Sequence, residues 1–138
     1  MKMLCLCCFA ILSLTGCGTE PLCSSDVQQI TRDLGSDRYA VTAVRNCGAT
    51  TDYATVVRVG RAGEPQSAAS EIFVADSNHG AATDGQGGAI WLNVVWAAPG
   101  QLSVAYASKA RVFKRVPDAK GASVRYKASD PYSLPPVP

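Results

Sequence analysis

The chain has 138 residues, a length that accommodates one domain. Hydrophobic residues make up 47% of it and charged residues 17%, which is typical of a packed globular domain and excludes intrinsic disorder. The formal net charge of +2 is too small to hold a nucleic-acid backbone. We therefore expect no nucleic-acid partner.

The N-terminus has the form of a signal peptide. Lys2 gives a positive start, and residues 3–14 are apolar apart from Ser13. This run is shorter than the roughly 20 apolar residues that a membrane-spanning helix needs. An ordinary secretory leader and a buried apolar helix are the alternatives at this point.

The residues that close the run are Leu14-Thr15-Gly16-Cys17, and they resemble the lipobox of bacterial lipoproteins. The resemblance implies that residues 1–16 are removed as a signal peptide and that Cys17 carries lipid on its sulfur and its amine. Three acyl chains would anchor the protein to a membrane without spanning it. Gly18 is not the Asp that retains similar lipoproteins in the inner membrane. We expect a cell-envelope location, on the outer membrane and facing the periplasm.

Six cysteines are present, but only two of them are expected to remain as free thiols for a disulfide. Three would leave with the leader and Cys17 would become a thioether, so Cys23 and Cys47 remain as thiols in an oxidising compartment. We predict a structural disulfide between them. A redox pair is the alternative, but its usual Cys-x-x-Cys spacing is absent.

The rest of the mature chain is divided into a tether over residues 17–25, a β-domain over 26–127 and a proline-rich tail over 128–138. Residues 26–34 are ambiguous. Val27, Ile30 and Leu34 fit one face of a short helix, whereas the turn residues at 34–37 favour a β-hairpin. We prefer the hairpin and keep the helix as the alternative.

After residue 37 the pattern is that of β-strands. β-branched and aromatic residues recur between turn signals such as Pro99-Gly100 and Lys120-Gly121. Apolar residues occupy both faces of the segment 89–97, which predicts a central strand buried on both sides. This spacing predicts an all-β fold, a small antiparallel sandwich or a barrel-like sheet. The predicted strands are 39–45, 53–59, 70–75, 89–97, 101–106, 111–116 and 122–127.

One further resemblance covers most of residues 23–127. The segment Cys47-Gly48-Ala49-Thr50-Thr51, a tryptophan strand, Leu102 with Tyr106, and Val124-Arg125-Tyr126 look like a family of small uncharacterised bacterial envelope proteins. The resemblance implies a shared fold unit and transfers no catalytic residue. Thr50, Thr51 and Tyr53 are either a structural corner or a small polar pocket at the sheet edge.

The loop over residues 76–88 is the most suggestive stretch for chemistry. It holds Asp76, Asn78 and the single histidine, His79, followed by several glycines. A calcium loop is excluded because its twelfth position is Gly87, where an EF-hand requires a glutamate. One histidine without free thiols makes no zinc set, so we expect no metal and no other cofactor. The loop is interpreted as a glycine-rich turn or as a contact surface.

Basic residues are concentrated near the C-terminus, with seven between Lys109 and Lys127. They are interpreted as solvated faces or edge protection. The alternative is one basic face, including Arg125 and Lys127, that rests on anionic lipid or envelope polymers.

These features predict a non-catalytic, lipid-anchored envelope protein that binds an unknown envelope protein, glycan or lipid. No Gly-x-Ser-x-Gly motif supports a hydrolase, so we do not expect an enzyme. One alternative is a periplasmic enzyme inhibitor, by analogy with lysozyme inhibitors, which are also compact β-lipoproteins. The other alternative is an enzyme that uses the loop over residues 76–88.

Overall fold

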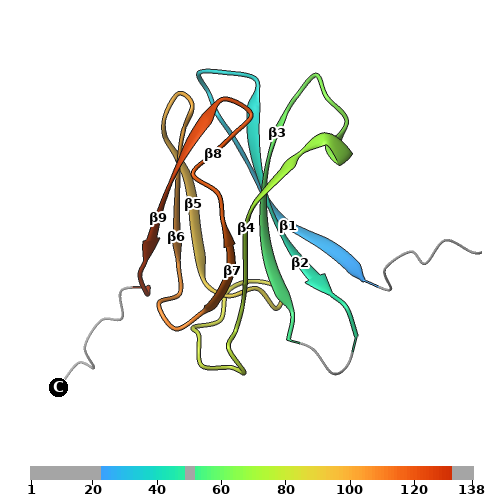
Figure 1. The fold of residues 1–138 in the computed structure, drawn as a ribbon, viewed down its shortest axis with the longest axis vertical. Coiled ribbons are helices and arrows are strands. Elements are labelled where there is room, and N and C mark those ends of the chain that lie inside the picture. The colour runs from blue at the N-terminus through green and yellow to red at the C-terminus, as the bar shows by residue number, and fades with distance from the viewer. Residues whose placement is uncertain (1–22, 49–51, 132–138) are drawn as a thin grey trace, which may run out of the picture.

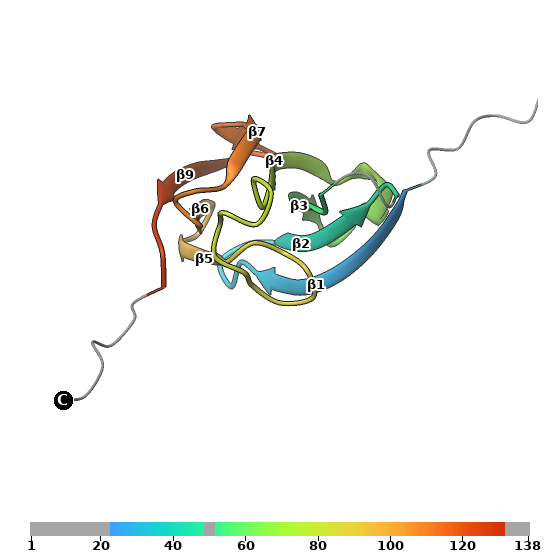
Figure 2. The same ribbon diagram turned by 90° about the horizontal axis from the view of Figure 1, so that it is seen from below.

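Two β-sheets packed face to face make up the fold (Figure 1 and Figure 2). The computed structural model describes residues 23–48 and 52–131. Within these ranges the chain forms nine strands and one short 3-10 helix, Gln66–Ala68. The all-β prediction is confirmed, and of the two predicted architectures the sandwich is found. In the described part of the chain, no helix is long and apolar enough to cross a membrane.

The first sheet has five strands in the order β1-β2-β3-β4-β7, and every neighbouring pair is antiparallel. Val57 and Val59 face the core of the sandwich, so the alternate residues Ala54, Val56 and Arg58 lie on the outer face. The strands are β1 (Ser24–Arg32), β2 (Arg38–Asn46), β3 (Ala54–Arg61), β4 (Ser70–Asp76) and β7 (Arg111–Arg115).

Residues 26–34 belong to a hairpin, as preferred, and the short-helix alternative is wrong. β1 pairs with β2 along its whole length, with a bulge between Val27 and Gln29. The bulge explains the misleading pattern, because it shifts the alternation of side chains by one residue and spaces Val27 and Ile30 as in a helix. The turn is closed locally, since the Asp33 carboxylate accepts hydrogen bonds from Gly35 N–H and Ser36 Oγ.

The second sheet has four strands in the order β5-β6-β9-β8. Its β5–β6 and β8–β9 pairs are antiparallel, as predicted, whereas its β6–β9 pair is parallel. The chain passes from β6 through β7 in the first sheet before it returns, and β9 then runs in the same direction as β6. The strands are β5 (Leu92–Ala98), β6 (Gln101–Tyr106), β8 (Asp118–Ala119) and β9 (Ala122–Ala128).

The segment predicted as a central strand lies at an edge of the second sheet. β5 begins only at Leu92, and residues before it form a loop with an isolated bridge between Asp84 and Ile90. Val94 is buried while Val95 is 43% exposed, so one face of β5 meets solvent. The tryptophans are only partly buried against the core. Residues 89–97 resemble a central strand because the apolar run combines a buried loop with an edge strand that is covered on one face only.

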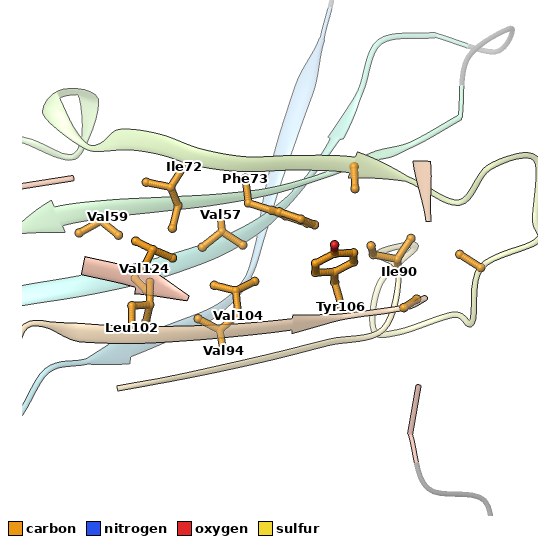
Figure 3. Close-up of a cluster of buried hydrophobic side chains, with 14 residues drawn as sticks. Val57, Val59, Ile72, Phe73, Ile90, Val94, Leu102, Val104, Tyr106 and Val124 are labelled. Atoms are coloured by element: carbon orange, nitrogen blue, oxygen red, sulfur yellow. The ribbon is translucent and has the colours of Figure 1, made fainter. Parts of the chain in front are cut away.

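The core lies between the two sheets, as Figure 3 shows. Phe73 of β4 packs against Tyr106 and Tyr126 of the second sheet, at ring-centroid distances of 5.1 and 6.0 Å. The predicted alternation of residues 101–106 is confirmed, because Leu102, Val104 and Tyr106 are buried. The second sheet is also tied to the first by the Tyr126 hydroxyl, which donates to the Ile72 carbonyl.

The ends of the domain differ slightly from the predicted segments. β1 begins at Ser24, inside the stretch predicted as a tether, and β9 ends at Ala128. Beyond it, Asp130 accepts a hydrogen bond from Ser108 N–H at 3.1 Å. The predicted signal peptide, Cys17, Thr50, Thr51 and the tail from residue 132 lie outside the described residues.

Candidate functional site

One cross-strand row on the outer face of the first sheet brings together residues from all five strands. Ser25, Arg45, Ala54, Asp76 and Arg111 are successive partners in the register of the sheet. The predicted disulfide between Cys23 and Cys47 is confirmed and lies at the β1–β2 end of this row, with a Cα–Cα distance of 4.0 Å. The disulfide therefore links the two strands at one edge of the row covalently.

Asp76 and Arg111 form the charged centre of the row. The guanidinium donates from Nε to both carboxylate oxygens at 3.2 Å, and Nη2 donates to Oδ2. The Asp76 side chain is only 6% exposed. Burial raises the pKa of this carboxyl, but the hydrogen bonds from Arg111 and from Asn78 N–H outweigh it, and the pKa lies below its ordinary value. Asp76 is therefore a fixed carboxylate that holds Arg111 in place.

The loop after β4 has an uncommon backbone conformation. Asn78 and His79 have φ values of 51° and 56°, and Gly80 follows with 85°. A left-handed conformation is sterically unfavourable for a residue with a Cβ, although Asn and His adopt it more often than most. Hydrogen bonds hold the loop in place, since Asn78 N–H donates to Asp76 Oδ1 and Gly80 N–H to Ser77 Oγ.

His79 is presented to solvent by this loop. Its backbone N–H donates to Asp52 Oδ2 at 2.9 Å, and its Nδ1 lies 3.5 Å from the same oxygen. The side chain is 76% exposed. The loop is thus more ordered than its glycines suggest, and further along it Ala82 and Ile90 join the core. An imposed backbone conformation that displays one exposed ring is typical of a functional position.

These residues line a cavity of about 370 Å³, which we call the His79–Arg111 pocket. Phe113 lies at the side of the pocket and is 60% exposed. The Arg111 guanidinium lies 5.2 Å from the centre of the Phe113 ring. The pocket is lined by Arg45, Cys47, Asp52, Ala54, Asp76, His79, Arg111 and Phe113.

Arg45 connects the pocket to an ion-pair network on the same face. Its Nη2 donates to Glu71 Oε2, and Arg58 and Lys114 lie 3.7 and 3.8 Å from the same carboxylate. Beneath this network Val56 is 1% exposed, although it points away from the core. The aliphatic parts of the long side chains therefore cover the outer face of the sheet.

The structure brings together only some of the residues predicted as a site. Asp76 and His79 line the pocket, and Asn78 contacts it only through the hydrogen bond from its N–H to Asp76 Oδ1. Tyr53 lies beside it in a groove with Asp52, and a Cβ on Gly88 would come within 2.7 Å of the Tyr53 ring. Thr50 and Thr51 are outside the described residues.

The basic residues do not form one face. Arg111 and Lys114 lie on the outer face of the first sheet, whereas Lys120 pairs with Glu64 near the turn before β9. Arg125 and Lys127 are exposed on β9, on the outer face of the second sheet, because Val124 and Tyr126, which alternate with them, point inward. The alternative of a single basic face between Lys109 and Lys127 is therefore wrong.

Sequence reasoning missed five residues of the pocket, namely Arg45, Asp52, Ala54, Arg111 and Phe113. Asp76 and Arg111 are 35 residues apart, and only the pairing of β4 with β7 makes them neighbours. One local signal was present. Phe113 sits in the most basic predicted strand, where a large apolar residue on a solvated face indicates a contact surface.

The pocket is chemically suited to binding. Each of its two guanidinium groups is engaged by a carboxylate on one side only. Within residues 23–48 and 52–131, no group of three or more His, Cys, Asp or Glu side chains could hold a metal ion. The fixed donors, the exposed ring and the apolar wall are features of sites that recognise a small anionic group.

A second feature lies at the opposite end of the sandwich, where the β1–β2 turn displays Leu34 with 99% exposure. The turn is rigid, because Asp33 Oδ2 accepts a hydrogen bond from Gly100 N–H at 2.8 Å. Gly35 packs so tightly on Pro99 that a Cβ would lie 2.4 Å from Pro99 Cγ. Sequence reasoning used Leu34 only as a helix or turn signal.

Comparison with known proteins found no match among protein-family models, curated proteins or solved structures. The fold and the pocket therefore carry the functional argument.

Proposed function

We propose that the protein is a non-catalytic, lipid-anchored binding module of the bacterial cell envelope, which offers the His79–Arg111 pocket to a small ligand. The observation that carries the proposal is the Cys23–Cys47 disulfide, only six residues after the lipobox cysteine. A disulfide of this kind forms and persists outside the reducing cytosol. The sequence before it supplies both the export signal and the lipidation site.

The pocket supports a binding role because its charged groups are held by one another. Asp76 is buried and paired, and Asp52 accepts from the His79 backbone. A general acid or base needs a group within reach of a reacting atom, and a nucleophile needs an adjacent base. Arg111 and His79 instead present donors from rigid supports, which is the arrangement of a recognition site.

The anchoring is tested by mass spectrometry of the protein from its native host. We expect the mature N-terminus at residue 17, with a mass increase that corresponds to three acyl chains. Cys17→Ala should keep the leader and incorporate no labelled palmitate, whereas the matched control Thr19→Ala should be lipidated like the wild type. An unmodified residue 17 in the wild type would refute the anchor.

A periplasmic enzyme inhibitor is the second candidate, and Leu34 is the observation that favours it. A rigid turn that displays one apolar side chain loses little conformational entropy when it enters a cleft. In a lysozyme activity assay, an inhibitor that acts through this turn should lose potency on Leu34→Ser. Val27→Ser, an exposed change on β1, is the matched control. No inhibition by the wild type would eliminate lysozyme as the target.

A further inference from the structure

We propose that the His79–Arg111 pocket binds the phosphate of a phospholipid headgroup in the membrane that holds the anchor. This inference rests on the proposed lipidation of Cys17 and deepens it, because it gives the folded domain its own contact with the membrane.

The first step is the position of the pocket relative to the anchor. The pocket residues Arg45, Asp76 and Arg111 share a cross-strand row with Ser25, which lies two residues after Cys23. Six Cα–Cα steps separate Cys23 from Cys17, and at no more than about 3.5 Å each they span about 20 Å. The anchor therefore keeps this end of the sandwich close to the headgroups.

The second step is the set of unused donors. Arg111 binds Asp76 through Nε and Nη2, and within the described residues its Nη1 has no hydrogen-bond partner. Arg45 binds Glu71 through Nη2, and its Nε and Nη1 have no hydrogen-bond partner among residues 23–48 and 52–131. Guanidinium groups recognise phosphate oxygens through such paired donors. Because the carboxylates already fix both side chains, binding orders them little further.

The third step is the charge around the pocket. Four basic residues, Arg45, Arg58, Arg111 and Lys114, share this face with three carboxylates. Those carboxylates are Glu71, Asp76 and Asp52, so one positive charge remains in excess. A single phosphodiester neutralises this excess, and the imidazole of His79 can add a further donor.

The fourth step is the exposed ring of Phe113. It stands at the rim of the pocket and is 60% exposed, so it offers apolar area to the glycerol carbons next to a lipid phosphate. A free phosphate ion has no such carbons. The ring therefore favours a lipid headgroup over inorganic phosphate as the ligand.

The test uses the full lipidated protein in an uncharged, phosphate-free detergent, titrated with water-soluble short-chain phosphatidylglycerol. Binding is followed by native mass spectrometry. We expect saturable binding of one lipid, weakened at least about tenfold by Arg45→Gln and by Phe113→Ala. His79→Ala should also weaken it. Arg125→Gln with Lys127→Gln removes two charges from the other sheet and should leave the binding constant unchanged.

Two further arms identify the ligand. Inorganic phosphate should compete only weakly, and soluble peptidoglycan fragments should not compete. Equal competition by inorganic phosphate would overturn the headgroup assignment. The assignment would also be overturned if the protein bound peptidoglycan fragments and did not bind phosphatidylglycerol. An equal loss in the Arg125 and Lys127 control would also overturn it, because diffuse charge would then explain the binding.

The failure of this inference is distinguishable from that of the anchor. Every variant is first compared with the wild type by thermal unfolding, so that loss of the fold is not read as loss of binding. The mass of the same preparation reports the lipidation of Cys17 directly. A lipidated protein without saturable lipid binding refutes the proposed lipid site and supports the anchor. An unlipidated protein that binds the lipid refutes the anchor and supports the lipid site.

Discussion

Two buried carboxylates, Asp33 and Asp76, perform the same structural task at opposite ends of the sandwich. Each accepts hydrogen bonds from groups distant in sequence, and each residue as a whole, backbone included, is 4% exposed. Asp33 joins the β1–β2 turn to the β5–β6 turn through Gly100 N–H. Asp76 joins the end of β4 to β7 through Arg111. Charged groups at these positions are stable because several hydrogen bonds compensate their burial.

These carboxylates predict a loss of stability in acid. The Gly100 N–H bond lowers the pKa of Asp33, and that of Asp76 is also lowered, both from an ordinary value of 3.8. A lowered pKa in the folded state contributes stability that is fully present above 3.8 and is lost as the pH falls through the lower folded value. Urea unfolding between pH 7 and pH 2 should show this decline.

The contribution of Asp76 is isolated by a substitution. Asp76→Asn should flatten the acid decline and lower stability at pH 7, because it removes the charge that Arg111 and Asn78 N–H bind. Asp26→Asn, on the exposed edge strand β1, is the matched control for the loss of one carboxylate. An unchanged acid decline in Asp76→Asn would contradict the role given to this pair.

Two phenylalanines of the first sheet provide a matched pair. Phe73 is fully buried between the sheets, whereas Phe113 is exposed on the outer face. Phe73→Ala removes a core ring and should lower the free energy of unfolding by about 3–5 kcal/mol. Phe113→Ala should change it by no more than about 0.5 kcal/mol. Urea unfolding of both variants checks the assignment, and equal losses would contradict it.

At the scale of elements, the β1–β2 hairpin is the part that most needs support. β1 is an edge strand whose residues are mostly exposed, so little apolar burial holds it to the sandwich. The turn at one end is closed by Asp33, and the disulfide closes the other end. β1 is therefore held by its pairing with β2 and by the bonds at its two ends, whereas β2 also packs into the sandwich.

Removal of the disulfide should accordingly destabilise the whole domain. Cys23 and Cys47 are 24 residues apart, and a closed loop of this size contributes about 3.5 kcal/mol in the chain-entropy model. Cys23→Ser with Cys47→Ser should lower the urea midpoint correspondingly. The matched control is Ser24→Ala, next to the bridge. A double variant as stable as the wild type would show that the hairpin does not depend on the bridge.

The sequence allowed prediction where structure depends on local pattern. The alternation of residues 101–106 gave the correct buried face of β6, because successive side chains of a strand point to opposite faces of the sheet and only one face of β6 is fully buried. The same reasoning misplaced β5, since an apolar run does not reveal whether a strand is central or at an edge. Asp76 and His79 were predicted from their loop, but Arg111 required the register of β4 with β7.

The whole molecule has two distinct ends. The Cys23–Cys47 bridge, the His79 loop and the start of β7 lie at one end, and the β1–β2 turn with Leu34 lies at the other (Figure 1). β1 alone has nine residues, which at about 3.3 Å each separate the two ends by roughly 30 Å. With the anchor at Cys17, the first end would face the membrane and Leu34 would face away from it.

This orientation predicts which positions approach lipid. A fluorophore attached through Lys109→Cys, in the loop before β7, should be quenched by vesicles that carry a quencher on their headgroups. The same fluorophore attached through Leu34→Cys should be quenched little, because about 30 Å of strand separates it from the tether. Both side chains are exposed, so the labels should leave the fold intact. Equal quenching of the two labels would mean that the anchor does not orient the domain, and the pocket would then have no fixed access to the headgroups.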